Sequence, residues 1–253
     1  GRNLTEFVQF MARYTSWNGY FGSGVASLAG KIGRCRSAFR DINEPLMTLS
    51  DHSVYVASFF FDAARDEFND HTTKGHRDTH RCLAQATLRG VIEYATQRDS
   101  GLLTVDMNKL TYEPVWLQNL NEDVAQGYGS GYPDNAYGCF RAMGYHVGSE
   151  LLADKEFTHL DEFIRRDPEL FQYLNTHTAA VAGLVHPCYK WVEVHSSLGG
   201  GAEADHFEWA VQGARIAFDY VDADKRDAMY TAIELGFMTF AQQHREFFTR
   251  VFN

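Results

Sequence analysis

The stretch GGGAEADH at residues 199–206 indicates both the fold and the chemistry to expect of this chain. Glu203 and His206 are three residues apart, so on a helix they project from one face about a turn apart. A carboxylate and an imidazole at this spacing can hold one metal ion, and Glu-x-x-His pairs recur in di-iron helical proteins. We therefore predict a helix after the glycines that presents Glu203 and His206 as metal ligands.

The rest of the chain has the pattern of an all-α protein. It contains only five prolines, its apolar residues recur with helical periodicity, and no stretch alternates convincingly like a strand. Helices are expected near 52–69, 76–96, 134–153, 168–176 and 202–220. Because no internal repeat or low-complexity linker interrupts the pattern, residues 1–253 are interpreted as a single helical domain.

Composition excludes two classes of partner. The formal charge is −10 and no cluster of Lys and Arg forms a basic patch, so we expect no nucleic-acid partner. No apolar run approaches the roughly 20 residues that span a bilayer, so no membrane partner is expected either. The four cysteines form no CxxC motif, which favours reduced thiols and a cytoplasmic protein.

A second candidate segment contains Glu67, followed by His71, His76 and His80. On an unbroken helix, His71 would lie about 6 Å from Glu67 along the axis and on its face, whereas His80 would lie about 20 Å away. The polar residues 70–75 predict a break, after which His80 could return toward Glu67 at the start of a new helix. The three histidines therefore stay open as alternatives, with Glu67 and His80 as the preferred ligand pair.

A third candidate is Glu150, which is surrounded by apolar and small residues. A carboxylate on such a face must be paired, protonated or metal-bound, so it is either a ligand or half of a buried ion pair. His146 lies one turn earlier and is interpreted as a supporting or core histidine. Gly144 and Gly148 lie on one face and would let another helix backbone approach closely.

The last candidate is His195, which precedes His206 by eleven residues. An ideal helix would place these two histidines on one face but about 16 Å apart. Three consecutive glycines are unfavourable in a helix interior by about 1 kcal/mol each, so a kink or bulge between the histidines is expected. Whether His195 reaches the same cluster as His206 stays open.

In order and type, these residues resemble the ligands of the haem-oxygenase-like di-iron oxidases and oxygenases. The resemblance spans roughly residues 50–220 and includes the phrases AARDEF at 63–68 and GYHVGSE at 144–150. It implies a bundle of about seven core helices and six metal ligands: Glu67, His80, Glu150, His195, Glu203 and His206. Two spacings differ from the family's pattern: the interval from Glu67 to His80 is longer, and His195 lies about four residues early.

The resemblance implies an O2-dependent oxidoreductase with two Fe(II) ions as its cofactor. Its expected substrate is a small amine or amino acid, which would undergo N-oxygenation or oxidative C–C cleavage in a biosynthetic pathway. No nucleotide-binding fingerprint is evident, so electrons must come from the substrate or an external donor. The alternative is a metal-free helical binding or salvage protein of the same fold. The substrate's identity and the oligomeric state, a monomer or a homodimer, stay open.

Overall fold

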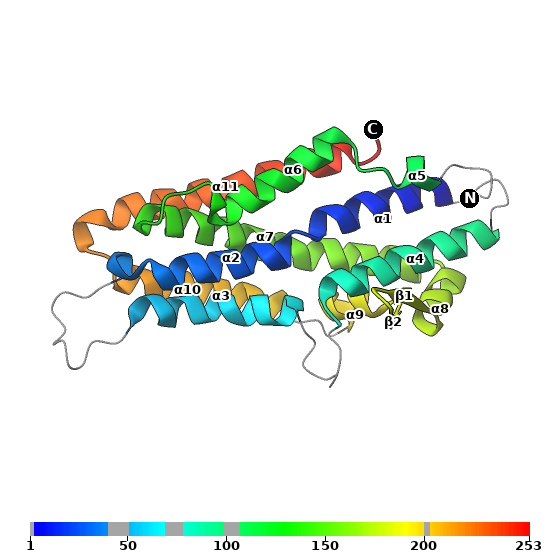
Figure 1. The fold of residues 1–253 in the computed structure, drawn as a ribbon, viewed down its shortest axis with the longest axis horizontal. Coiled ribbons are helices and arrows are strands. Elements are labelled where there is room, and N and C mark those ends of the chain that lie inside the picture. The colour runs from blue at the N-terminus through cyan, green and yellow to red at the C-terminus, as the bar shows by residue number, and fades with distance from the viewer. Residues whose placement is uncertain (1–2, 40–50, 69–77, 99–106, 200–202) are drawn as a thin grey trace.

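The computed structural model describes residues 3–39, 51–68, 78–98, 107–199 and 203–253. These residues form a predominantly helical structure with one small β-hairpin (Figure 1). The α-helices and strands are α1 (Leu4–Asn18), α2 (Phe21–Arg34), α3 (His52–Phe68), α4 (His80–Arg98), α5 (Met107–Leu110), α6 (Val115–Ala125), α7 (Ala136–Arg165), α8 (Pro168–Thr176), β1 (Thr178–Val181), β2 (Leu184–Pro187), α9 (Lys190–His195), α10 (Glu203–Asp219) and α11 (Arg226–Arg250).

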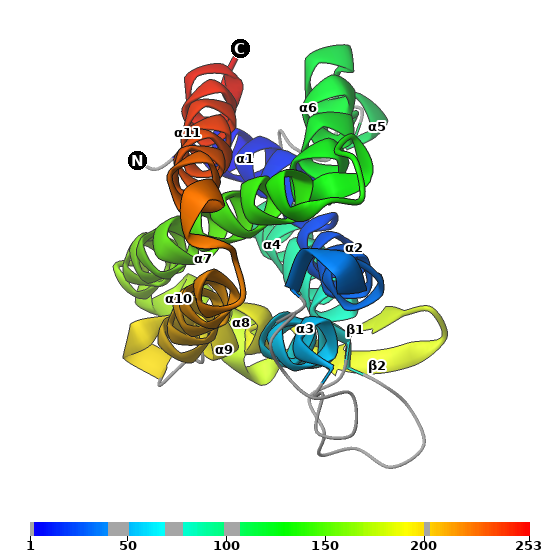
Figure 2. The same cartoon turned by 90° about the vertical axis from the view of Figure 1, so that its left-hand side faces the viewer.

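Helix α7 runs through the middle of the bundle. Helix α11 packs along one side of it and α10 along another, while α3 lies against both α2 and α10 (Figure 2). Helix α4 packs against α1. The C-terminal end of α3, the N-terminal end of α4 and helix α9 consequently meet near the middle of the molecule (Figure 1).

The predicted helices lie close to the observed ones, and side-chain caps explain several boundaries. Asn3 accepts a hydrogen bond from the Glu6 amide at the start of α1, and Asn135 accepts one from the Gly138 amide at the start of α7. Helix α8 has the predicted bounds because Asp167 caps it and Pro168 occupies its first turn. In contrast, α7 continues to Arg165, well beyond the predicted end near residue 153.

Two glycines allow α7 and α11 to approach closely. A Cβ at Gly144 of α7 would overlap the carbonyl oxygen of Ile233, and one at Gly236 of α11 would overlap the carbonyl oxygen of Arg141. The predicted close approach at Gly144 is thus confirmed. At Gly148 the approach is less close: a built Cβ would lie 3.3 Å from the Phe240 side chain and 3.4 Å from the carbonyl oxygen of Phe237, both on α11. The packing of α7 against α11 determines which face of α7 points away from α11, toward α10.

The hairpin of β1 and β2 was not predicted, because its strands are only four residues long. Its turn residues Ala182 and Gly183 both have positive φ, at 53° and 80°, as a two-residue type I′ turn requires. Figure 2 shows the hairpin projecting from the side of the bundle. On β2, the buried His186 places its Nδ1 2.6 Å from a carboxylate oxygen of Asp78, two residues before α4 begins.

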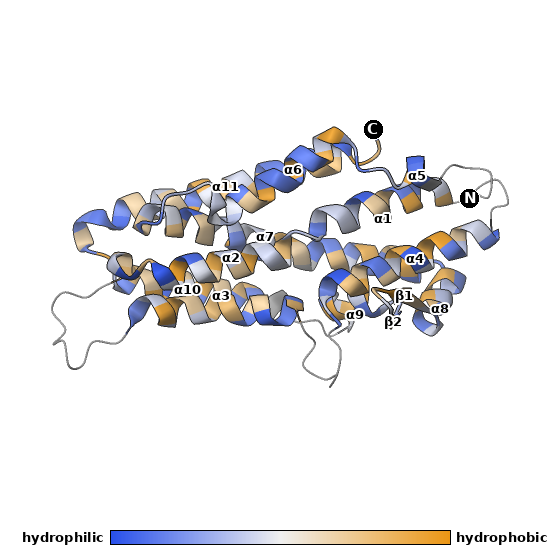
Figure 3. Ribbon diagram, viewed as in Figure 1, coloured by the Kyte–Doolittle hydropathy of each residue, from blue (hydrophilic) through white to orange (hydrophobic). Residues whose placement is uncertain are grey.

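Most helices have apolar residues on one face and polar residues on the other (Figure 3). The apolar faces pack together into one core. Trp17, Tyr14 and Phe247 are among the largest fully buried side chains of this core. Among the residues that the structure describes, no helix is both long enough and apolar enough to span a bilayer.

Candidate metal centre

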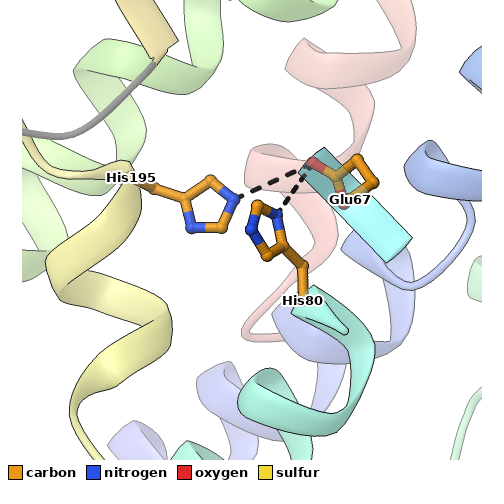
Figure 4. A group of neighbouring side chains, drawn as sticks. All are labelled: Glu67, His80 and His195. Atoms are coloured by element: carbon orange, nitrogen blue, oxygen red, sulfur yellow. Dashed lines mark ion pairs between the residues drawn. The ribbon is translucent and has the colours of Figure 1, made fainter. Parts of the chain in front are cut away.

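Glu67, His80 and His195 come from three helices and meet at one point (Figure 4). Each offers one ligand atom, and these atoms all lie within 4.8 Å of one another. Glu67 is the second-last residue of α3, His80 is the first of α4 and His195 is the last of α9. We call these three residues the triad. Among the described side chains, no other group of three His, Cys, Asp or Glu residues meets the same distance limit.

His80 reaches Glu67 because the N-terminal end of α4 lies beside the C-terminal end of α3 (Figure 1). The Nδ1 atom of His80 lies 3.1 Å from Oε1 of Glu67. Thr79 caps α4 by accepting a hydrogen bond from the Cys82 amide, and the Asp78–His186 pair attaches this end of the helix to the hairpin. Glu67 and His80 therefore belong to separate helices. The predicted break at residues 70–75 lies outside the described residues, as do His71 and His76.

A hydrogen bond to a backbone carbonyl and a stacking contact hold the His195 ring in place. Its Nδ1–H donates to the carbonyl oxygen of Trp191 at 2.7 Å, and the ring stacks on Phe157 with centroids 4.3 Å apart. In the neutral tautomer this bond leaves a lone pair on Nε2, which lies 3.9 Å from Oε1 of Glu67. Metal-bound histidines in proteins commonly donate their second ring N–H to a carbonyl in this way.

A buried carboxylate, Asp161 of α7, fixes both ends of α9. It accepts hydrogen bonds from the hydroxyl of Tyr189, which precedes α9, and from Ser196, which follows His195, the latter at 2.7 Å. Arg165 donates to the same carboxylate at 2.7 Å. Asp161 is completely buried, so these bonds replace its lost hydration. The position of His195 thus depends on a residue of α7.

The donor set of the triad fits a divalent cation. His80 Nδ1 is buried and, although close to Glu67, makes no hydrogen bond of acceptable direction. Burial raises the pKa of Glu67, but attraction by His80 and His195 outweighs this effect and holds the pKa well below its ordinary value. Glu67 is therefore a carboxylate at neutral pH. One carboxylate and two imidazoles facing one point form the ligand set that non-haem Fe(II) oxygenases use.

A second polar group lies next to the triad and joins α3, α7 and α10. His206 Nε2 lies 3.1 Å from Oδ2 of Asp66, and its Nδ1 lies 3.7 Å from Oε2 of Glu150. The other oxygen of Glu150 lies 3.2 Å from Nδ1 of His146. Because Asp66 and Glu67 are consecutive, the two groups are adjacent. Glu150 and His206 thus approach each other as predicted, within a buried region.

Burial controls the protonation of this second group. It lowers the pKa of His146 to about 3, with repulsion from His206 as a smaller cause, so His146 is neutral at neutral pH. Burial, and then the charge of Glu150, raise the pKa of Tyr128 well above its ordinary value, so it remains a phenol. The Tyr128 hydroxyl lies 2.9 Å from Oγ of Ser149, beside Glu150. Glu150 thus has buried, uncharged polar side chains beside it.

A cavity of about 220 Å³ opens onto both groups. Glu67, His80 and His195 line it together with Glu150 of the second group, and Trp17 contributes an apolar wall. A cavity of this size admits a small molecule next to the proposed ligands. We call it the metal-site cavity.

Six ligands were predicted from the sequence, and the structure brings five of them to this region. Glu67, His80 and His195 form the triad, while Glu150 and His206 belong to the second group. Glu203 is the first residue of α10, but its side chain lies outside the described part of the structure. The sequence analysis did not identify Asp66, for which the available signal was its position directly before Glu67.

No family model, curated protein or solved structure matches this chain. The interpretation of the site therefore depends on the geometry above and on the order of the candidate ligands along the sequence.

Proposed function

We propose that the protein is a non-haem di-iron oxidase or oxygenase that activates O2 and acts on a small amine or amino acid. The observation that carries the proposal is the triad, in which two imidazole nitrogens and a carboxylate oxygen face one point with a cavity beside them. The resemblance of the ligand order to haem-oxygenase-like di-iron proteins supports the same function and a bundle of that type.

The residues divide into two proposed iron positions. The triad would hold one ion, while Glu150 and His206, with Glu203 from the resemblance and Asp66 from the geometry, would hold the other. Ferrous iron bound at these residues would supply the electrons that reduce O2. Mixed nitrogen and oxygen ligands favour iron or manganese over metals that prefer thiolates.

The protein's own groups would orient the ligands and keep water out. The Trp191 carbonyl fixes the tautomer of His195, and Phe157 fixes the plane of its ring. Neutral His146, whose Nδ1 lies 3.2 Å from a carboxylate oxygen of Glu150, can orient that carboxylate by hydrogen bonding. The substrate would bind in the metal-site cavity, whose lining includes the exposed Arg81.

The test is an iron count after anaerobic ferrous loading, followed by measurement of O2 consumption with candidate amines. Wild type should bind two irons per chain. His195→Ala and His206→Ala should each lose one iron and the O2 consumption while remaining folded by circular dichroism. His177→Ala is the matched control because His177 is an exposed histidine outside both groups.

Two other results would change the proposal. A single iron that His195→Ala removes and His206→Ala leaves in place would indicate a mononuclear two-His-one-carboxylate enzyme, which the triad alone would also suit. Failure to bind any iron would favour the metal-free binding or salvage protein of the same fold.

A further inference from the structure

A second cavity of about 570 Å³ lies between α1, α7 and α11. Its volume falls within the range of about 300–1,000 Å³ that is usual for small-molecule sites. Glu156 of α7 lines this cavity and also lines the metal-site cavity. The two cavities therefore share one side chain as a boundary. We call the larger one the aromatic cavity.

Aromatic rings dominate the lining of the aromatic cavity. Phe7, Phe10 and Tyr14 contribute from α1, Phe163 from α7, and Phe248 from α11. Glu6 and Lys155 also line this cavity. Both are exposed, so their charges stay hydrated at its rim. The interior is thus suited to an apolar molecule, and its electron-rich ring faces also attract an organic cation.

Glu156 is the acidic group buried at the boundary. Its side chain is only 9% exposed. The Tyr14 hydroxyl donates a hydrogen bond to Oε2 at 2.7 Å, and His244 Nε2 lies 2.8 Å from Oε1 without a hydrogen bond of acceptable direction. An ionised carboxylate has about four acceptor positions, so these contacts leave capacity for a further donor.

We propose that the aromatic cavity binds an organic ammonium ion with an apolar body, and that Glu156 accepts its N–H groups. Aromatic rings around a carboxylate combine cation–π attraction with a charge-assisted hydrogen bond, and both select an ammonium over a neutral or anionic head group. This inference deepens the proposed function, on which its last step rests. It assigns the substrate as an amine held at the boundary of the metal-site cavity by its nitrogen, with its apolar body in the aromatic cavity.

Binding to the metal-free protein tests the ligand class separately from the chemistry. Isothermal titration calorimetry would compare octylamine, octanol and octanoate at pH 7, below their critical micelle concentrations. The amine should bind at least tenfold more tightly than the alcohol, and the carboxylate most weakly. From hexylamine to octylamine, each added methylene should raise the affinity about fourfold, the value expected for a CH2 group buried in an apolar site.

Two pairs of variants identify the residues responsible. Glu156→Gln keeps the shape and the Tyr14 hydrogen bond but removes the charge, so the preference for amine over alcohol should fall below about threefold. Glu162→Gln, the same change at a half-exposed side chain of α7, should keep the full preference. Leu152→Trp fills the cavity and should abolish binding of all three ligands, whereas Leu151→Trp, on the exposed adjacent residue, should not.

Equal or tighter binding of octanol or octanoate would overturn the assignment of an ammonium ligand. Equal binding to Leu151→Trp and Leu152→Trp would overturn the aromatic cavity as its location, even if Glu156→Gln failed to fold. A protein that binds two irons but shows no amine preference would refute this inference alone. One that binds amines through Glu156 but never binds iron would refute the proposed function and leave the amine site standing.

Discussion

Replacing Asp161 by Asn should test how strongly α7 controls the candidate metal centre. The substitution keeps the size of a completely buried side chain but turns one acceptor oxygen into an amide donor. Three donors converge on the carboxylate, from Arg165, Tyr189 and Ser196. The amide of Asn has only one acceptor oxygen, so it can accept hydrogen bonds from only some of these three donors. The Ser196 hydroxyl also accepts a hydrogen bond from the Leu198 amide, so it would have to turn its proton away from position 161 and use its second lone pair to accept from the new amide.

The expected loss of stability follows from these bonds. A hydrogen bond to a charged group contributes about 1.5–3 kcal/mol, and a buried donor left without an acceptor carries a similar cost. If one or two of the three bonds are lost or weakened, Asp161→Asn should lower the free energy of unfolding by about 2–4 kcal/mol. Because Tyr189 and Ser196 lie at the two ends of α9, the change should also displace His195 and weaken ferrous binding at the triad by at least tenfold.

Urea unfolding and ferrous titration would measure the two effects on the same protein. The matched control is Glu162→Gln, which removes an adjacent, half-exposed carboxylate whose contacts with Arg166 and His159 are 3.8 and 3.5 Å long. Such surface pairs contribute at most about 1 kcal/mol, so the control should resemble wild type. The reasoning fails if Asp161→Asn loses less than about 1 kcal/mol, or if it loses stability but binds ferrous iron with wild-type affinity.

Three further outcomes are expected. Gly144→Ala should destabilise the protein by about 2–3 kcal/mol through overpacking against α11, whereas Gly30→Ala, in an open part of α2, should be neutral or stabilising by up to about 1 kcal/mol in urea unfolding. Hydrogen bonds from Arg34 and Lys31 lower the pKa of Asp134 from 3.8 to about 2. The stability that Asp134 contributes should therefore be complete above about pH 4 and disappear as the pH falls through about 2, so the difference in urea midpoint between wild type and Asp134→Asn should shrink over that range. Ferrous iron at a free concentration of 100 times its dissociation constant should raise the free energy of unfolding of wild type by about 2.7 kcal/mol. In thermal melts, the alanine variants of the triad should show a smaller increase in stability on adding iron.

The helices could largely be predicted from the sequence because their signals are local. Asn3 and Asp167 lie directly before the helices that they cap, and the apolar periodicity marks α3, α4 and α10 to within a few residues. The hairpin gave a weaker signal, since Ala182-Gly183 is not among the strongest type I′ turn pairs and each strand is short. The length of α7 was underestimated because its apolar pattern becomes less regular in its second half, although no residue there breaks a helix.

The candidate site was predictable as a set of residues but not as an arrangement. Glu150 was identifiable because a carboxylate among apolar neighbours needs a partner. The division into two groups was not predictable, because it depends on where α3, α4 and α9 end relative to one another. The role of Asp161 could not be predicted: its one local partner, Arg165, forms an ordinary i,i+4 ion pair, whereas Tyr189 and Ser196 are 28 and 35 residues away in sequence.

Glu150 and the triad differ in how they are held, and this difference bears on how a metal would act on the fold. Glu150 lies in the interior of α7, where backbone hydrogen bonds on both sides fix its position. All three triad residues lie in terminal turns, where part of the backbone hydrogen bonding is missing and position depends on caps and distant partners. For His80 and His195 those partners are His186, through Asp78, and Asp161. A cation at the triad would therefore crosslink the ends of α3, α4 and α9, so its binding energy should stabilise these helix ends more than it stabilises α7.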